Sequence, residues 1–440
     1  MQKKSIDIIC MGCSKNLVDA ELLANQLEAN GYETHFDPNP SKAKIVIINT
    51  CGFIGDAKEE SINQILSFAK KRKRGSVEKL LVMGCLSERY LKELTTEIPE
   101  VDKFYGKFAW KEIITDLKGE YRPHCANVHK LSTPSHYAYV KISEGCDRRC
   151  AYCAIPIITG KYKSRPIEEI VSEVESLVAQ GVKEFQIIAQ DLTYYGKDLY
   201  GKFAIADLVE KISDVKGVEW IRLHYAYPTQ FPYDLLKVMR ERDNVCKYLD
   251  IALQHIDNDI LKAMRRPITE EETNSLLQRI REEVPGIHIR TTLMVGFPNE
   301  TEEQFNKLME FTRKAKFERM GAFTYCEEEG TYAGDHLKDN IDEKTKEKRL
   351  GQLMDLQEGI AEELNKAKVG QTFKVIIDRK EGDYYYGRTE FDSPEVDPEV
   401  LIPTANGELT IGEFYQVRIN DYEYFDLIGE WPMGIKNFEF

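Results

Sequence analysis

The 440-residue sequence lacks any long apolar run. A helix that crosses a membrane needs about 20 consecutive, mostly apolar residues, and no segment approaches that length. The first residues, MQKKSI, carry two lysines but neither a long apolar stretch nor a small-residue cleavage site, so no signal peptide is predicted. We therefore expect a cytoplasmic protein without membrane contact. Internal repeats and low-complexity segments are also missing.

The sequence has no excess of positive charge. It holds 60 Lys and Arg against 74 Asp and Glu, which gives a net charge of −14. A protein that binds nucleic acid over its whole surface would be basic, so the net charge disfavours this class of protein. It does not exclude a local basic patch. The basic run at residues 70–74 is interpreted as a solvated helix end, where cations suit the helix dipole.

Cysteine, in contrast, occurs at ten positions. In a reducing compartment a disulfide framework is rare, so these thiols indicate metal ligands or catalytic groups. Hydrophobic residues make up 42% of the chain and charged residues 30%, as in globular proteins. The length predicts two or three domains.

The pattern of apolar residues changes along the chain. Residues 1–122 alternate short apolar runs with helical segments, which predicts a parallel α/β domain. Residues 123–136 resemble a linker, and the alternation resumes over 137–368 with six units. This predicts an open, partial (βα)6 barrel, because closure would need eight units. Residues 369–440 have a period of two, which predicts a small all-β domain.

Strands are expected in all three regions. In the first they are predicted at residues 6–10, 45–48 and 80–83; in the second at 139–143, 185–189, 220–225, 248–253, 287–295 and 320–325; in the third at 373–377, 384–389, 399–402 and 414–424. The third region holds 15 Asp and Glu against 6 Lys and Arg, a net charge of −9. Most of the acidity of the chain is therefore concentrated there.

Cys146, Cys150 and Cys153 form a C-x3-C-x2-C run just after the first predicted barrel strand. Three thiolates on one short loop can bind three irons of a 4Fe-4S cube and leave the fourth iron open to a small ligand. Structural zinc is the main alternative. It needs four ligands, usually as two pairs, and the neighbouring sequence offers no partner pair. We therefore predict an iron–sulfur cluster on this loop.

Cys13, Cys51 and Cys85 each follow an apolar strand of the first region, and each has a glycine beside it. In a parallel sheet the carboxyl ends of the strands share one edge, where ligands bind. Three thiols would then converge, which predicts a second three-cysteine cluster; buried structural cysteines are the alternative. The remaining four cysteines lack such a context and receive no role: Cys10, Cys125, Cys246 and Cys326.

Several short motifs surround these cysteines. The C-x3-C-x2-C run with Tyr152 before its last cysteine resembles the radical SAM signature. The segments GCSKN at 12–16, NTCGF at 49–53 and MGC at 83–85 resemble the methylthiotransferases. The segments YVKISEGC at 139–146, RLHY at 222–225, VGFP at 295–298 and SPEVD at 393–397 are similar to the RimO group, the ribosomal protein S-twelve methylthiotransferases. The resemblance covers essentially the whole chain.

This resemblance implies a methylthiotransferase domain, a radical SAM barrel and a C-terminal TRAM β-barrel. It also implies two 4Fe-4S clusters and S-adenosylmethionine (SAM), which chelates the open iron of the barrel cluster. An electron then cleaves SAM to a 5′-deoxyadenosyl radical, while the second cluster carries sulfur that a methyl group reaches from another SAM. Relatives insert methylthio at the β-carbon of an aspartate. That C–H bond is beyond a carboxylate or histidine base, so no acid or base residue is assigned.

Four further residues are candidates for SAM binding, with ordinary structural roles as the alternative. They are Tyr152, where relatives contact the adenine, and Gln190, Gln254 and Arg290, near the carboxyl ends of predicted barrel strands. Arg165 could bind a carboxylate through its guanidinium or pair locally. His224 and His255 are interpreted as structural histidines.

Three functions stay open. The first is methylthiolation of the ribosomal protein, the second is tRNA adenosine 2-methylthiotransfer, and the third is a non-catalytic iron–sulfur RNA-binding or sensor protein. An acidic C-terminal domain disfavours tRNA, whose phosphates require Lys and Arg, and could dock a basic protein by complementary charge. We predict the first function, with the small ribosomal subunit or its protein S-twelve as partner and flavodoxin or ferredoxin as electron donor.

Overall fold

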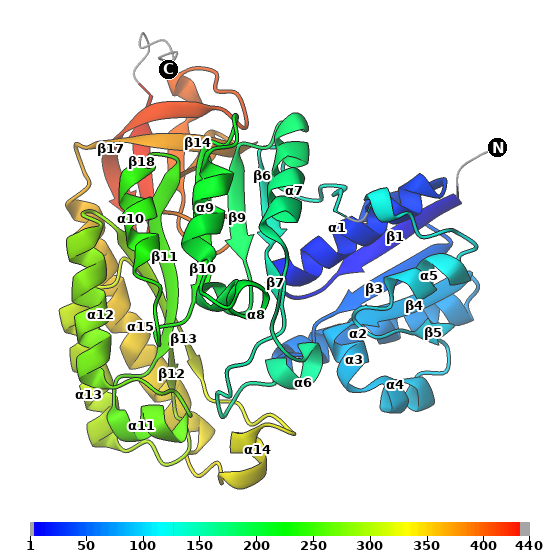
Figure 1. The fold of residues 1–440 in the computed structure, drawn as a ribbon, viewed down its shortest axis with the longest axis horizontal. Helices are drawn as coiled ribbons and strands as arrows, with labels where there is room; N and C mark the ends of the chain where they lie inside the picture. Colours follow the sequence, from blue (N-terminus) through cyan, green and yellow to red (C-terminus); the bar gives the residue numbers. More distant parts are fainter. Residues whose placement is uncertain (1–3, 126, 432–440) are drawn as a thin grey trace.

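The computed structural model describes residues 4–125 and 127–431. Three units follow one another along the chain and can be told apart by colour in Figure 1: an N-terminal unit (β1 to α5), a central unit (β6 to α15) and a C-terminal unit (β14 to β18). Within the described residues, no helix is both long and apolar enough to cross a membrane.

The N-terminal unit is a five-stranded parallel sheet between two layers of helices. Its strand order is β2 (Tyr32–Phe36), β1 (Lys4–Cys10), β3 (Ile45–Thr50), β4 (Lys79–Gly84) and β5 (Lys103–Phe104). Its helices are α1 (Ser14–Ala29), α2 (Gly55–Lys73), α3 (Cys85–Arg89), α4 (Leu91–Glu97) and α5 (Trp110–Asp116). The three central strands are buried on both faces, which explains their continuous apolar runs. These three were predicted; the short edge strands β2 and β5 were not.

The central unit is an open sheet of six parallel strands. Along the sheet these are β6 (Tyr137–Lys141), β9 (Glu184–Ile188), β10 (Trp220–Ala226), β11 (Val245–Gln254), β12 (His288–Val295) and β13 (Arg319–Thr324). The main helices are α7 (Ile167–Ala179), α9 (Ile205–Ser213), α10 (Asp234–Glu241), α12 (Glu270–Glu283), α13 (Glu302–Ala315) and α15 (Glu343–Lys366). All six strands were predicted, and β6 and β13 form the two open edges. The predicted (βα)6 architecture is therefore confirmed.

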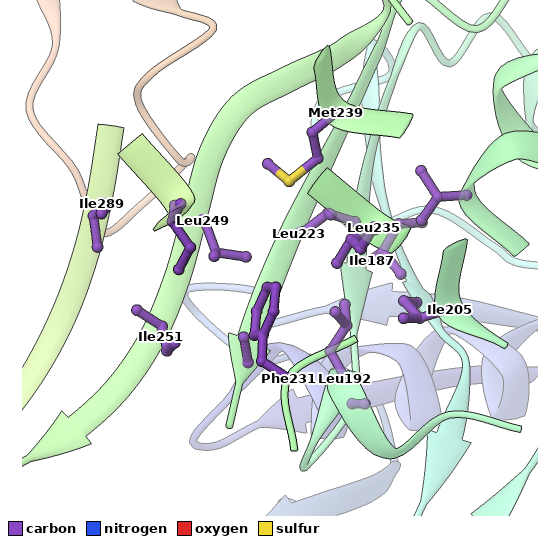
Figure 2. Packing of buried hydrophobic residues seen from close by; sticks show 14 of the residues in the cluster. Ile187, Leu192, Ile205, Leu223, Phe231, Leu235, Met239, Leu249, Ile251 and Ile289 are labelled. Carbon is purple, nitrogen blue, oxygen red and sulfur yellow. The ribbon is translucent and has the colours of Figure 1, made fainter. Parts of the chain in front are cut away.

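The core of the central unit lies between these strands and their helices. Figure 2 shows Ile187, Leu223 and Leu249 from neighbouring strands close to Leu235 and Met239 of α10. All five side chains are fully buried. Burying each one contributes about 1.5–3 kcal/mol relative to leaving it exposed. Neighbouring strands thus pack against one apolar layer of helices.

The C-terminal unit is a closed barrel of five strands. In order around the barrel these are β14 (Thr372–Glu381), β15 (Tyr384–Thr389), β16 (Val400–Pro403), β18 (Asp426–Glu430) and β17 (Phe414–Glu423). The predicted all-β domain is confirmed. Four of its strands were predicted; β18 was missed because it follows β17 after only two residues.

Some acidic side chains of the C-terminal unit are buried against the central unit. Its buried ion pairs with the central unit include Arg388–Glu184 (2.7 Å), Arg290–Asp397 (3.2 Å) and Arg319–Asp392. Asp392 and Asp397 have side chains only 3% and 2% exposed. These two carboxylates neutralise arginines of the central unit and are therefore not available to a docking partner.

The N-terminal unit contacts both edges of the open sheet. At the β6 edge, Lys141 pairs with Asp19 of α1. At the β13 edge, Glu328 in the following loop accepts hydrogen bonds from Lys58 (2.7 Å) and Arg89 (2.8 Å) of the N-terminal unit. The N-terminal unit therefore bridges the gap that the six strands leave open.

A buried histidine of the connecting segment strengthens the contact at the β6 side. Nδ1 of His129 lies 2.8 Å from Glu21 of α1, and Nε2 lies 3.0 Å from Glu173 of α7. Burial disfavours the charged ring, but the hydrogen bonds to Glu173 and Glu21 outweigh it and raise the pKa of His129 to about 9. At neutral pH a charged imidazolium therefore joins the two units.

We predict that this contact weakens in alkaline solution. The folded pKa of about 9 lies above the ordinary value of 6.5, so the contribution is fully present below pH 6.5 and is lost as pH rises through about 9. The shift corresponds to about 3 kcal/mol. The difference in free energy of unfolding between the wild type and His129→Gln, measured with urea, should shrink between pH 6.5 and 9.5. A difference that stays constant over this range would contradict the charged bridge.

Candidate functional site

Three strand ends of the N-terminal sheet carry Cys13, Cys51 and Cys85. Cys13 lies between β1 and α1, Cys51 follows β3, and Cys85 begins α3 directly after β4. The three strands are adjacent and parallel, so these residues share one edge, as predicted. Gly12 has a φ of 89°, and a Cβ there would come within 2.6 Å of the Cβ of Cys51. The glycine beside the thiol is therefore required for this close approach.

A loop of the central unit carries the other three cysteines. Cys146, Cys150 and Cys153 lie between β7 (Ser143–Glu144) and α6 (Ile155–Thr159). This loop faces the N-terminal unit, where α6 contacts α3. A single cavity of about 350 Å³ between the two units is lined by both sets of cysteines. We call them the N-terminal triad (Cys13, Cys51, Cys85) and the central triad (Cys146, Cys150, Cys153).

Burial governs the protonation of these thiols. Burial raises the pKa of Cys85 and of Cys146 to about 12, and it raises the pKa of Cys51 and Cys153 as well. A nucleophilic cysteine requires the opposite shift. Without a metal Cys51, Cys85, Cys146 and Cys153 keep their protons at neutral pH, and a bound metal would have to displace them. The site therefore suits metal ligation better than thiol catalysis.

The spacing of the thiols bears on which metal group fits. Within residues 4–125 and 127–431, no three His, Cys, Asp or Glu side chains are arranged to hold a single metal ion. Zinc requires its ligands at about 2.0–2.3 Å from one centre, whereas each thiolate of an iron–sulfur cube binds a different iron. The donor set, three free thiols on each side of one cavity, fits two cubes better than zinc.

Arg266 lies against the central triad. Its Nη1 is 3.6 Å from Sγ of Cys150 and 3.4 Å from the hydroxyl of Tyr152. The side chain is buried, and its Nε has no partner within the described part of the chain. Sequence reasoning missed this residue, because it follows α11 (Asn258–Ala263), more than a hundred positions from the cysteines. Only the fold brings it to the cavity.

Three more cations line the cavity, and they too were missed. They are Lys15, Lys107 and Arg148. Lys107 pairs with Glu144 (2.9 Å) and Arg148 pairs with Asp191 (2.8 Å). Lys15 and Arg148 lie inside the GCSKN and C-x3-C-x2-C motifs, so proximity in sequence to the cysteines could have indicated them. A positively charged wall suits the negative charge of thiolate-bound iron.

Three of the four residues predicted to bind SAM line this cavity: Tyr152, Gln190 and Gln254. Oε1 of Gln190 is buried and has no partner among the described residues. Arg290 does not line the cavity. It pairs instead with Asp397 of the C-terminal unit, at 3.2 Å, so its contacts join two units.

The residues interpreted as structural have local partners. Arg165 pairs with Glu173, and His255 lies 3.1 Å from Glu300. His224 lies 2.8 Å from the side-chain oxygen of Gln186, and burial lowers its pKa well below the usual value. The basic run at residues 70–74 lies at the carboxyl end of α2, as predicted.

Known families match each unit of the chain. The family described as "Radical SAM superfamily" matches residues 140–312, "Uncharacterized protein family UPF0004" matches 5–106, and "TRAM domain" matches 369–431. Among solved structures, the chain is similar to the radical S-adenosylmethionine methyltransferase TsrM from Kitasatospora setae. The TM-score is 0.56 with 14% identity, over 76% of this chain and 77% of that one. At this identity the likeness concerns the fold alone.

Curated relatives match over nearly the whole length. The chain is 63% identical to "Ribosomal protein uS12 methylthiotransferase RimO" of Bacteroides thetaiotaomicron, over 97% of this chain and 98% of that one. The protein of the same name from Parabacteroides distasonis is 61% identical over 98% and 99%. That of Cytophaga hutchinsonii is 48% identical over 98% of both chains. The chain therefore belongs to the RimO family of radical SAM methylthiotransferases.

Proposed function

We propose that this protein adds a methylthio group to the β-carbon of an aspartate in ribosomal protein uS12, using two 4Fe-4S clusters and SAM. The central triad would hold the cluster that binds SAM, and the N-terminal triad would hold the cluster that carries sulfur. The observation that carries the proposal is that both triads line one cavity. A substrate carbon in that cavity would be within reach of both centres.

The residues around the central triad fit a SAM-binding cluster. A cluster with one open iron, held by the central triad, would supply one-electron chemistry that can act on an unactivated carbon. The side chains of the protein would bind and orient SAM. Tyr152, Gln190 and Gln254 line the same cavity as the triad and are proposed to contact SAM, and Arg266 would donate a hydrogen bond to the Cys150 thiolate. These charge-assisted contacts favour the deprotonated ligand.

The protein substrate is favoured over tRNA by the relatives and by charge. The proteins 63% and 61% identical over the whole chain are named for uS12. Seven acidic residues of the C-terminal unit are exposed: Glu381, Asp383, Glu395, Glu408, Glu413, Asp421 and Glu423. They would repel tRNA phosphates and could attract a basic protein. A non-catalytic sensor is disfavoured because a cavity beside the clusters serves no structural purpose.

The domain boundaries, the electron donor and the location are proposed with the same function. The domain boundaries stay at 1–122, 123–136, 137–368 and 369–440, supported by the start of β6 at Tyr137 and of β14 at Thr372. Arg290, which the sequence made a candidate for SAM binding, is proposed instead to stabilise the contact between the central and C-terminal units. A flavodoxin or ferredoxin is proposed as electron donor, and the cytoplasm as the location.

The activity can be tested with reconstituted protein. We expect the reduced enzyme, given SAM, sulfide and uS12, to produce a peptide with one methylthio group on an aspartate, detected by mass spectrometry. Cys150→Ala should abolish the product, because a ligand of the open-iron cluster is removed. The same mixture should contain tRNA. Modification of the tRNA and not of uS12 would contradict the substrate assignment.

The two triads can be separated by iron analysis. Changing Cys13, Cys51 and Cys85 together to Ala should remove about half of the iron, since each triad holds one of two equal cubes, while release of 5′-deoxyadenosine from SAM persists. Changing the central triad should remove the other half and abolish that release. Cys125→Ala, outside the cavity, is the control and should keep all iron. A triple variant with wild-type iron content would exclude its triad as a ligand set.

A further inference from the structure

Lys15 crosses from one wall of the cavity to the other. It lies in the first turn of α1, two residues after Cys13, and lines the cavity. Its Nζ lies 3.4 Å from the ring centroid of Tyr225, near the end of β10. Two residues further on, the hydroxyl of Tyr227 is 3.7 Å from Sγ of Cys150. The ammonium group is thus held between the side that carries the N-terminal triad and the side that carries the central triad.

Lys15 forms no close ion pair with a carboxylate among the described residues, although it interacts electrostatically with the buried carboxyl of Asp250. The other cations of the wall have partners: Lys107 with Glu144 (2.9 Å), Arg148 with Asp191 (2.8 Å) and Arg266 with Sγ of Cys150 (3.6 Å). Burial raises the pKa of Asp250, and Lys15 is one of the charges that oppose this rise. The ammonium lies over the face of Tyr225, a cation–π interaction that leaves N–H donors available.

Local stability does not explain a lysine at this position. The N-terminus of a helix carries the positive end of the helix dipole, where a cation is unfavourable. The first turn of α1 contains no acidic residue that would offset it. Tyr225, which holds the ammonium, has a φ of 64°, a costly backbone conformation for a bulky side chain. Two locally unfavourable features therefore meet at one point of the cavity, as is common at ligand sites.

We propose that Lys15 binds the carboxylate of the substrate aspartate and thereby positions its β-carbon between the two triads. An ammonium group donates up to three hydrogen bonds, and a carboxylate accepts them. The β-carbon is bonded directly to the carboxylate carbon, so fixing the carboxylate also fixes the reacting carbon. Asparagine and the neutral ring of adenosine offer no anion to Lys15. This inference rests on the proposed function and names the group that selects aspartate.

The test compares binding of two uS12 peptides to the reconstituted protein, one with the target aspartate and one with asparagine there. Lys15→Met should weaken binding of the aspartate peptide by about 10- to 100-fold, the usual effect of losing a charge-assisted hydrogen bond. Binding of the asparagine peptide should not change, and Lys15→Arg should restore part of the preference. Lys42 is exposed and does not line the cavity. Lys42→Met is therefore the matched control and should bind both peptides as the wild type does.

Iron content and SAM affinity, measured on the same proteins, identify the other roles that Lys15 could have. Equal weakening for both peptides would show that Lys15 does not recognise the carboxylate. Loss of iron would assign it to the N-terminal triad, and weaker SAM binding alone would assign it to SAM; each outcome overturns the proposal. Wild-type protein that binds the aspartate peptide but never methylthiolates it would instead refute the proposed function.

Discussion

The six thiols face one another because the N-terminal unit docks on a sheet that does not close. Six strands leave two free edges, and the N-terminal unit contacts both of them, through Asp19 and His129 on one side and through the partners of Glu328 on the other. These contacts are buried ion pairs. Removing one partner of such a pair is costly, because the other charge stays buried and unmatched. The docking geometry, and with it the spacing of the triads, is therefore specified by discrete charges.

The cavity that results is lined by cations, of which Lys107 and Arg266 are buried. In such surroundings electrostatic interactions are stronger than in solution, so the positions of Arg266 and Lys15 matter more than their number. Arg266 lies at a ligand of the central triad, while Lys15 reaches the same cavity from the N-terminal unit. One face of the cavity would thus stabilise a negatively charged cluster and the other would accept an anionic side chain. A closed eight-stranded barrel would leave no gap for the second face.

Local periodicity and motif spacing were sufficient to predict much of the fold and of the candidate site. All six strands of the central unit and both triads were predicted from the sequence, because each is marked by neighbouring residues. Strands β2, β5 and β18 were missed since they are short and lie at edges or tight turns. Arg290 is the third residue of β12, so it lies in the half of the strand away from the carboxyl edge where the cavity forms. Arg266 reaches the cavity, and Asp392 and Asp397 become buried, through contacts between segments that are distant in sequence. The net charge counted along the chain does not reveal such contacts.

The most direct test is a crystal structure of the anaerobically reconstituted protein with an anomalous map recorded at the iron edge. The account predicts two iron–sulfur clusters in one cavity, one bound by Cys13, Cys51 and Cys85 and the other by Cys146, Cys150 and Cys153. Iron at one triad alone, or a single metal ion with four ligands in place of a cluster, would contradict it.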